Sequence, residues 1–189
     1  MKYLKDDIPE QMKPPKAGQT QDEVLGIDLV KLALRPDDRV LDIGCGSGKV
    51  AIAIAARVSG VSAVDRNGEA IAYAREQARK AETGNITFYQ QEAVDFLAGA
   101  GRFDCAFVGG SGRLAEVLAL LATQVDRTIV VNAVLLATLH TAVTEMQRLG
   151  IFREALQVQV SRSHPIAGNF MWKPADPVYV IVGGRSPCS

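Results

Sequence analysis

Residues 40–50 read VLDIGCGSGKV, an apolar run that breaks into three glycines within five positions. The apolar part is typical of a buried strand, and glycine lets the turn that follows approach a ligand with its backbone. Residues 49–58, KVAIAIAARV, have helical composition, so the turn leads into the free N–H groups of a helix start. This stretch therefore predicts a strand, a turn and a helix that together wrap part of a nucleotide.

Strand-like and helix-like segments alternate along the rest of the chain. The predicted strands are 39–44, 60–65, 86–92, 103–110 and 128–134, and the predicted helices are 20–34, 49–58, 67–81, 112–123 and 135–150. Thr20 and Glu23 have the spacing of a capping box at the start of the first helix. Two more strand-like runs, 154–163 and 177–184, flank the loop PIAGNFMWKPAD and predict an antiparallel hairpin at the sheet edge. The pattern predicts an α/β fold, a doubly wound and mostly parallel sheet of seven strands.

Length and composition indicate one soluble domain. The 189 residues divide into a polar arm, residues 1–19, and a single domain, residues 20–189. Lys plus Arg and Asp plus Glu balance at 21 each, which gives no reason to expect nucleic acid as a partner. The three cysteines, Cys45, Cys105 and Cys188, lie too far apart for a disulfide framework or a metal site. With no apolar leader or membrane span, we expect a cytoplasmic protein.

The glycine turn has an acidic partner at the end of the next strand. The turn consists of Gly44, Cys45, Gly46, Ser47 and Gly48. Asp65 ends the predicted strand 60–65, where a carboxylate can accept hydrogen bonds from both hydroxyls of a ribose. Ligands of such sheets lie beyond the carboxyl ends of the central strands. We therefore expect these residues to form one site, although a tight turn and an Asp65 that caps the next helix would fit the same residues.

The spacing of the glycines distinguishes between nucleotides. A dinucleotide fingerprint, G-x-G-x-x-G, would need its third glycine at Lys49. The chain instead has G-x-G-x-G with Asp42 two residues earlier, and a carboxylate there suits an ammonium group better than a pyrophosphate. This pattern resembles the first motif of class I S-adenosylmethionine-dependent methyltransferases, which implies that Glu92 and Ala93 contact the adenine. A nicotinamide or flavin cofactor is the alternative.

Other motifs make the resemblance more specific. GQTQDEV (18–24), FVGGSGRL (107–114), IVVNAVLLATL (129–139), VQVSRSHPIAG (158–168) and PVYVIVGG (177–184) are similar to the cobalt-precorrin decarboxylating methyltransferases of cobalamin biosynthesis. The resemblance covers roughly residues 8–184. It implies methylation of carbon 15 of a macrocycle such as cobalt-precorrin-6B, with loss of the ring-C acetate carboxyl. It also implies S-adenosylmethionine as methyl donor, Thr20 beside it, and a homotetramer.

A second glycine turn and a few polar side chains are the candidates for substrate binding. The turn contains Gly109, Gly110, Ser111 and Gly112, which could leave room for a flat ring, bind carboxylates through backbone N–H groups, or simply be flexible. Arg113 and Arg162 could bind the substrate's carboxylates with paired hydrogen bonds, or be solvated surface residues. Asn132, inside an apolar strand, is either a satisfied internal amide or a group that orients the substrate.

The chemistry requires no covalent nucleophile, because a methyl group on a sulfonium is already activated. His164 is a candidate for proton transfer, whereas His140 is expected to be structural and Cys45 to be merely small enough for its turn. Two other functions use the same donor site. One is methylation of RNA or protein, against which VGGSGR (108–113) replaces an N-P-P-Y/F motif. The other is a non-catalytic module that binds S-adenosylmethionine.

Overall fold

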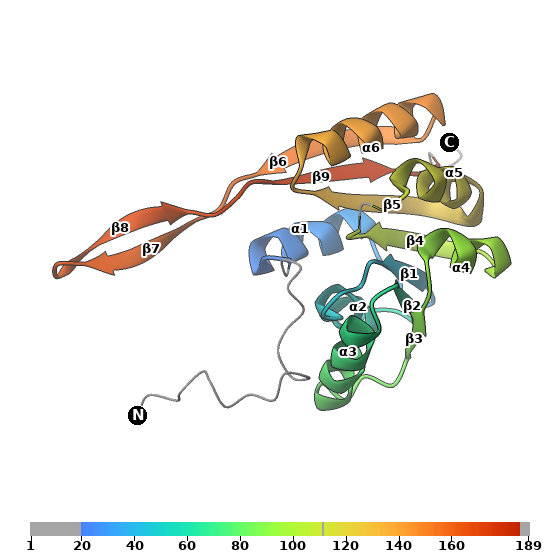
Figure 1. The fold of residues 1–189 in the computed structure, drawn as a ribbon, viewed down its shortest axis with the longest axis horizontal. Helices are drawn as coiled ribbons and strands as arrows, with labels where there is room; N and C mark the ends of the chain where they lie inside the picture. Colours follow the sequence, from blue (N-terminus) through green and yellow to red (C-terminus); the bar gives the residue numbers. More distant parts are fainter. Residues whose placement is uncertain (1–19, 111, 186–189) are drawn as a thin grey trace.

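The computed structural model describes residues 20–110 and 112–185, so the predicted arm and Ser111 lie outside the described residues. Seven strands form one sheet in the order β3-β2-β1-β4-β5-β9-β6 (Figure 1). They are β1 (Arg39–Ile43), β2 (Gly60–Asp65), β3 (Ile86–Gln90), β4 (Phe103–Val108), β5 (Val125–Ala133), β6 (Phe152–Val158) and β9 (Val178–Gly183). The first five strands are parallel, and β9 is antiparallel to both of its neighbours. The predicted doubly wound α/β fold is confirmed.

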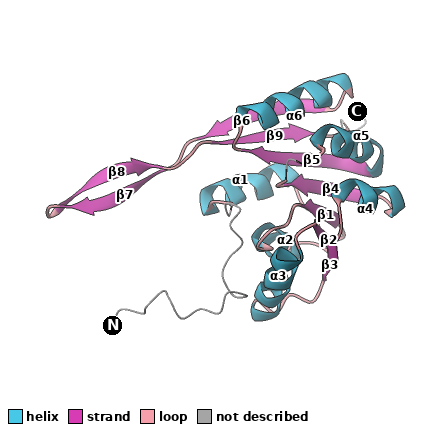
Figure 2. Ribbon diagram, viewed as in Figure 1, coloured by secondary structure: helices cyan, strands magenta, loops and turns pink. Residues whose placement is uncertain are grey.

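Six helices cover the two faces of the sheet (Figure 2). They are α1 (Asp22–Leu32), α2 (Lys49–Ala55), α3 (Gly68–Lys80), α4 (Ala93–Gly99), α5 (Leu114–Gln124) and α6 (Leu136–Arg148). The first three pack on one face and the last three on the other, and each face has its own apolar core. In β4, Cys105 and Phe107 enter one core while Ala106 and Val108 enter the other, as the two-residue repeat of a strand requires.

Three local expectations differ from the structure. The capping box at Thr20 is wrong: α1 begins after Gln21, which makes no side-chain cap, and the Thr20 carbonyl instead accepts a hydrogen bond from Lys49. Helix α4 was not expected: only Leu97 of its seven residues is buried, so it has no apolar repeat, whereas the equally short α2 buries four residues. The segment predicted as the loop PIAGNFMWKPAD belongs mostly to a hairpin.

That hairpin is a two-stranded ribbon, β7 (Ser161–Ile166) and β8 (Asn169–Pro174), inserted between β6 and β9. It extends away from the sheet as an arm (Figure 1), and every residue of both strands is exposed. Ala167 and Gly168 both have positive φ, as a tight hairpin turn requires. Because neither face of the ribbon is buried within the chain, its sequence lacks the alternation that predicts strands. Within the described residues, no helix is long and apolar enough to cross a membrane.

Candidate functional site

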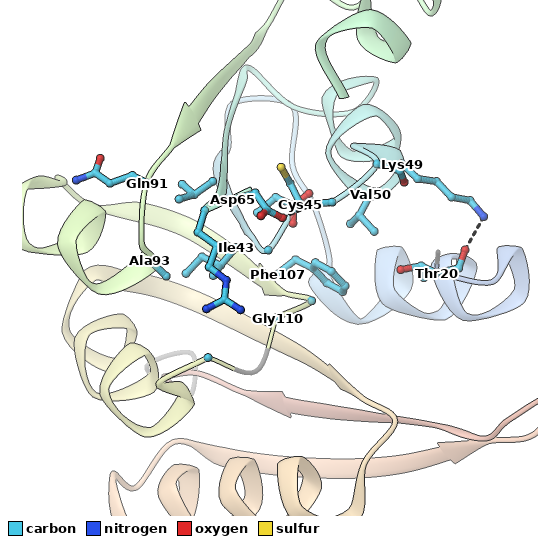
Figure 3. Close-up of a pocket in the computed structure, with 18 of the residues that line it drawn as sticks. Thr20, Ile43, Cys45, Lys49, Val50, Asp65, Gln91, Ala93, Phe107 and Gly110 are labelled. Carbon is cyan, nitrogen blue, oxygen red and sulfur yellow. Dashed lines mark hydrogen bonds between the residues drawn. The ribbon is translucent and has the colours of Figure 1, made fainter. Parts of the chain in front are cut away.

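A cavity of about 310 Å³ opens at the carboxyl ends of β1, β2 and β4 (Figure 3). This is the point at which the strand order changes direction, where ligands of doubly wound sheets bind. Most of the residues expected at a donor or substrate site line it, namely Thr20, Asp42, Gly44, Cys45, Gly46, Ser47, Asp65, Glu92, Ala93, Gly109, Gly110 and Gly112. The fold therefore brings five separate segments of the chain together around one cavity.

The two glycine turns touch each other at the floor of this cavity. A Cβ atom on Gly44 would lie 2.7 Å from the backbone nitrogen of Gly110. The Gly109 N–H donates to the Ile43 carbonyl at 2.8 Å, which fixes the second turn against the end of β1. Gly44 also has a φ of +72°, so both its conformation and its surroundings exclude a side chain. The turns can approach this closely because backbone packs on backbone.

Asp65 holds the first turn in place and leaves acceptor capacity free. Its Oδ2 accepts a hydrogen bond from the Gly46 N–H and its Oδ1 one from the Asn67 N–H, both at 2.9 Å. A carboxylate can accept about four hydrogen bonds, so the group can still receive two hydroxyls. The alternative in which Asp65 caps the next helix is wrong, because Asn67 is the N-cap of α3 and accepts from the Glu69 and Ala70 N–H groups.

Asp42 is the unusual charge of the site. Its residue is 0% exposed, and neither carboxyl oxygen has a hydrogen-bond partner among the described residues. Burial raises the pKa of Asp42 to about 7; the backbone N–H of Ala51, which lies too far or too oblique for a hydrogen bond, acts to lower it, and the carboxyl groups of Asp65 and Asp28 add to the rise. A buried carboxyl without a partner is costly, and a cationic group bound in the cavity would remove that cost.

Asn132 lies outside the cavity lining, under α1. Its Nδ2 donates to Oδ2 of the fully buried Asp28 at 2.7 Å, and burial raises the pKa of Asp28 to about 7 against the effect of this hydrogen bond. Asp28 Oδ1 and Asn132 Oδ1 have no partner within the described ranges. The amide is thus held inside the protein by Asp28, a residue that the sequence did not single out.

Lys49 forms the wall of the cavity on the side of α1. Its Nζ lies 2.5 Å from the Thr20 carbonyl oxygen (Figure 3) and 2.7 Å from the Asp22 carboxylate. These contacts fasten the start of α1 to the start of α2, directly after the first glycine turn. Gly48, the preceding residue, does not line the cavity; a Cβ there would lie 2.8 Å from the Cβ of Ala74, so it permits close packing with α3.

Several lining residues were not among the candidates. The apolar ones are Ile43, Val50, Val64 and Phe107, and the polar ones are Lys49, Arg66 and Gln91. The Arg66 side chain is 73% exposed, and its ion pair with Glu92 is long, at 3.7 Å. Its position directly after Asp65, at the end of a strand predicted to bind ligand, is the signal in the sequence that could have found it.

The remaining candidates lie outside the cavity lining. Arg113 precedes α5 in a left-handed conformation and pairs with Glu116 at 2.5 Å. Arg162, on the ribbon strand β7, pairs with Glu23 of α1 at 2.5 Å. His164 lies on the same exposed strand. The cavity is therefore lined by the two glycine turns, a few charged groups and four apolar residues, with the candidate arginines and His164 further out.

The sheet order and the glycine turn with its acidic partner define the fold of a class I methyltransferase. Comparison with known proteins is more specific, since a model of the precorrin methyltransferase domain matches residues 16–183. A probable cobalt-precorrin-6B C(15)-methyltransferase (decarboxylating) of Methanosarcina acetivorans is 39% identical over 173 residues, covering 89% of this chain and 94% of its own. The chain belongs to the precorrin methyltransferase family.

Solved structures agree with this assignment. Precorrin 8W decarboxylase of Methanobacterium thermoautotrophicum matches with a TM-score of 0.87 and 29% identity, over 94% of this chain and 100% of its own. Precorrin-6Y C5,15-methyltransferase of Geobacter metallireducens matches with a TM-score of 0.85 and 29% identity, over 92% of this chain and 93% of its own. The predicted family and fold are thus confirmed from sequence and from structure.

Proposed function

We propose that this chain transfers a methyl group from S-adenosylmethionine to carbon 15 of cobalt-precorrin-6B and that the carboxyl group of the ring-C acetate leaves as carbon dioxide, which leaves a methyl group on the ring. The observation that carries the proposal is the unpaired, buried carboxyl of Asp42 beside the Asp65-bound glycine turn. The names of the relatives favour a cobalt-precorrin as acceptor over RNA or protein. A non-catalytic module would bind the donor without turnover.

The lining residues fit the parts of the proposed donor. Asp65 has free acceptor positions for the two ribose hydroxyls, and Asp42 provides the negative charge for the ammonium of the methionine part. A Cβ built on Gly46 would meet nothing closer than 3.9 Å, which leaves space for a ligand over the turn. Glu92 and Ala93 line the side at which we expect the adenine. When bound, S-adenosylmethionine supplies a methyl group already activated by its sulfonium.

The chain's own residues would then act by binding, orientation and exclusion of water. Burial raises the pKa of the Cys45 thiol, which keeps it neutral and unsuited to nucleophilic attack. Holding the methyl group in line with an electron-rich ring carbon can itself provide much of the rate enhancement. We propose Asn132 as an orienting amide and His164 as a proton-transfer group, with Arg113 and Arg162 as ligands of the substrate's carboxylates.

We further propose that the protein is a cytoplasmic homotetramer. Ile166, Phe170, Met171 and Trp172 are 48–64% exposed on the ribbon, and an isolated two-stranded ribbon is marginally stable at best. Strand β6 also leaves one free edge on the sheet. The double change Phe170→Ser with Trp172→Ser should lower the mass measured by light scattering. An unchanged mass would show that the ribbon does not join the copies.

Calorimetry with S-adenosylhomocysteine tests the donor site. We expect binding to the wild type and a loss of about 1–3 kcal/mol in Asp65→Ala, the range for hydrogen bonds to a charged group. Asp37→Ala removes an exposed carboxylate at the other end of β1 and should bind like the wild type. If neither the wild type nor the control binds, the proposed function is wrong.

A further inference from the structure

This inference rests on the proposed function. The cavity is large enough for S-adenosylmethionine but not for the macrocycle as well, so the two substrates must bind in different places. Small-molecule sites range from about 300 to 1,000 Å³, and this cavity, at about 310 Å³, is at the lower limit. A nucleoside with an amino-acid tail takes up that space. A tetrapyrrole macrocycle is far larger than what remains, so it has to rest on the rim of the cavity, next to the methyl group.

The rim beyond the second glycine turn is formed by the end of β5. Val108 of β4 pairs in register with Val131 of β5, so the Gly109 turn and the residues after Ala133 leave the sheet side by side. Val134, Leu135 and Leu136 follow there and lead into α6. A Cβ built on Gly112, in the second glycine turn, has no atom within 4 Å, so the space beside that Cβ is open.

These three residues form an apolar run that the fold does not use. Val134, Leu135 and Leu136 are 58%, 65% and 67% exposed. The buried residues of α6 are Ala142 and Met146, and Leu139 is the first residue of the helix to pack against the core, so Leu136 is left outside it. Single exposed apolar residues are ordinary, but three in succession carry a solvation cost that usually reflects a binding surface.

We propose that Val134, Leu135 and Leu136 form an apolar platform that binds one flat face of the macrocycle during methyl transfer. The conjugated ring faces are apolar, while the substrate's carboxylates lie at its edge and can stay in water or meet arginines. The strand register places the platform next to the Gly109 turn, which lines the cavity, and this position beside the methyl donor favours substrate over a second copy of the chain.

Steady-state kinetics with cobalt-precorrin-6B and S-adenosylmethionine test the platform. Leu135→Ser and Leu136→Ser should each raise KM for the macrocycle about tenfold, because each removes one buried leucine contact. Their affinity for S-adenosylhomocysteine and their molecular mass should equal those of the wild type. Leu135→Met keeps the apolar surface and should keep KM. Val30→Ser, which changes an apolar residue of α1 that is 75% exposed, is the matched control and should have no effect.

The outcomes separate this inference from the proposed function. If the wild type converts the substrate and both serine variants keep its KM, the platform is wrong and the proposed function stands. If the serine variants lower the molecular mass, the three residues join copies of the chain and the platform is again wrong. If the wild type binds S-adenosylhomocysteine but converts no cobalt-precorrin, the proposed function fails, and the platform fails with it.

Discussion

Two buried carboxyl groups lie at opposite ends of β1 and have opposite surroundings. Asp38, before the strand, is 3% exposed, and Asp42, near its carboxyl end, is 0% exposed. Asp38 accepts hydrogen bonds from both terminal nitrogens of Arg127, at 2.6 and 2.7 Å, and from the Arg35 N–H at 2.7 Å. Asp42 accepts none from the described part of the chain.

The difference appears in the two pKa values. Burial acts to raise the pKa of Asp38, but the hydrogen bonds from Arg127 and from the Arg35 backbone outweigh it, and the pKa is lowered. At Asp42 the backbone N–H of Ala51 acts against burial but does not offset it, and the pKa is about 7. The amino end of β1 is thus complete within the protein, whereas the carboxyl end lacks a cation. The comparison teaches that an incomplete buried site, more than burial itself, marks the place for a ligand.

The largest change in the free energy of unfolding should come from replacing Arg127. Arg127→Met leaves the Asp38 carboxyl buried without its partner and should lower the free energy of unfolding by about 3–5 kcal/mol. Because the folded pKa of Asp38 is lowered, the pair's contribution is present above the unfolded pKa of about 3.9 and is lost as pH falls through the folded value. Urea unfolding at pH 7 measures the loss. A loss below about 1 kcal/mol would contradict a strong pair at this end of β1.

Asp42→Asn should raise the free energy of unfolding, in contrast to Arg127→Met. The unfolded state releases the Asp42 proton near pH 4, while the folded state keeps it to about pH 7, so stability falls as pH rises between these values. Asparagine has no proton to release, and the variant should be more stable than the wild type at pH 8, by on the order of 2 kcal/mol. It should also bind S-adenosylhomocysteine more weakly. A variant less stable than the wild type at pH 8 would show that Asp42 has a partner in the folded protein.

A smaller effect should appear in the pH dependence of donor binding. Between pH 6 and pH 7.5 the ligand's ammonium remains mostly charged while Asp42 ionises, so wild-type affinity for S-adenosylhomocysteine should rise about fivefold. In Asp42→Asn the affinity should stay flat over this interval. Calorimetry of both proteins at several pH values measures this difference in affinity. Parallel curves for the two proteins would assign the titration to another group.

The smallest change in stability should come from Arg113→Gln. The Arg113 and Glu116 side chains are 50% and 56% exposed, and such pairs add little to stability in water. The unfolding midpoint in urea should therefore not move, in contrast to Arg127→Met. If Arg113 binds a carboxylate of the substrate, KM for the macrocycle should rise in the same variant. A shifted midpoint would mean that Arg113 supports the fold around α5.

Much of the fold could be predicted because its strands are buried and its helices alternate with them. The succession of β1 to β5 along the chain and the placement of the glycine turns follow from local pattern and from the rule for ligand sites in such sheets. The ribbon could not be predicted, since all its residues are exposed and have no repeat. Helix α4 was missed because only one of its residues, Leu97, is buried, which leaves no apolar repeat in its sequence.

The candidate site also has a part that the sequence could predict and a part that only the packed structure shows. Asp42, Asp65 and the glycines stand close in sequence to the turn that they form, so their spacing was informative. The contact of Asp28 with Asn132 joins residues 104 positions apart and depends on how α1 packs on β5. The missing partner of Asp42 is likewise a property of the packed structure. Sequence could show that a carboxyl group stands there, but not that the protein leaves it unpaired.

The titration of the Asp42 carboxyl carbon, followed by carbon-13 NMR without and with S-adenosylmethionine, tests the central claim most directly. Without the ligand we expect a pKa of about 7, and with it a clear fall, because the ammonium would supply the missing cation. Asp38 provides the internal reference and should titrate below its ordinary range in both samples. An ordinary pKa for Asp42 in the free protein, or a raised one that the ligand leaves unchanged, would contradict the account.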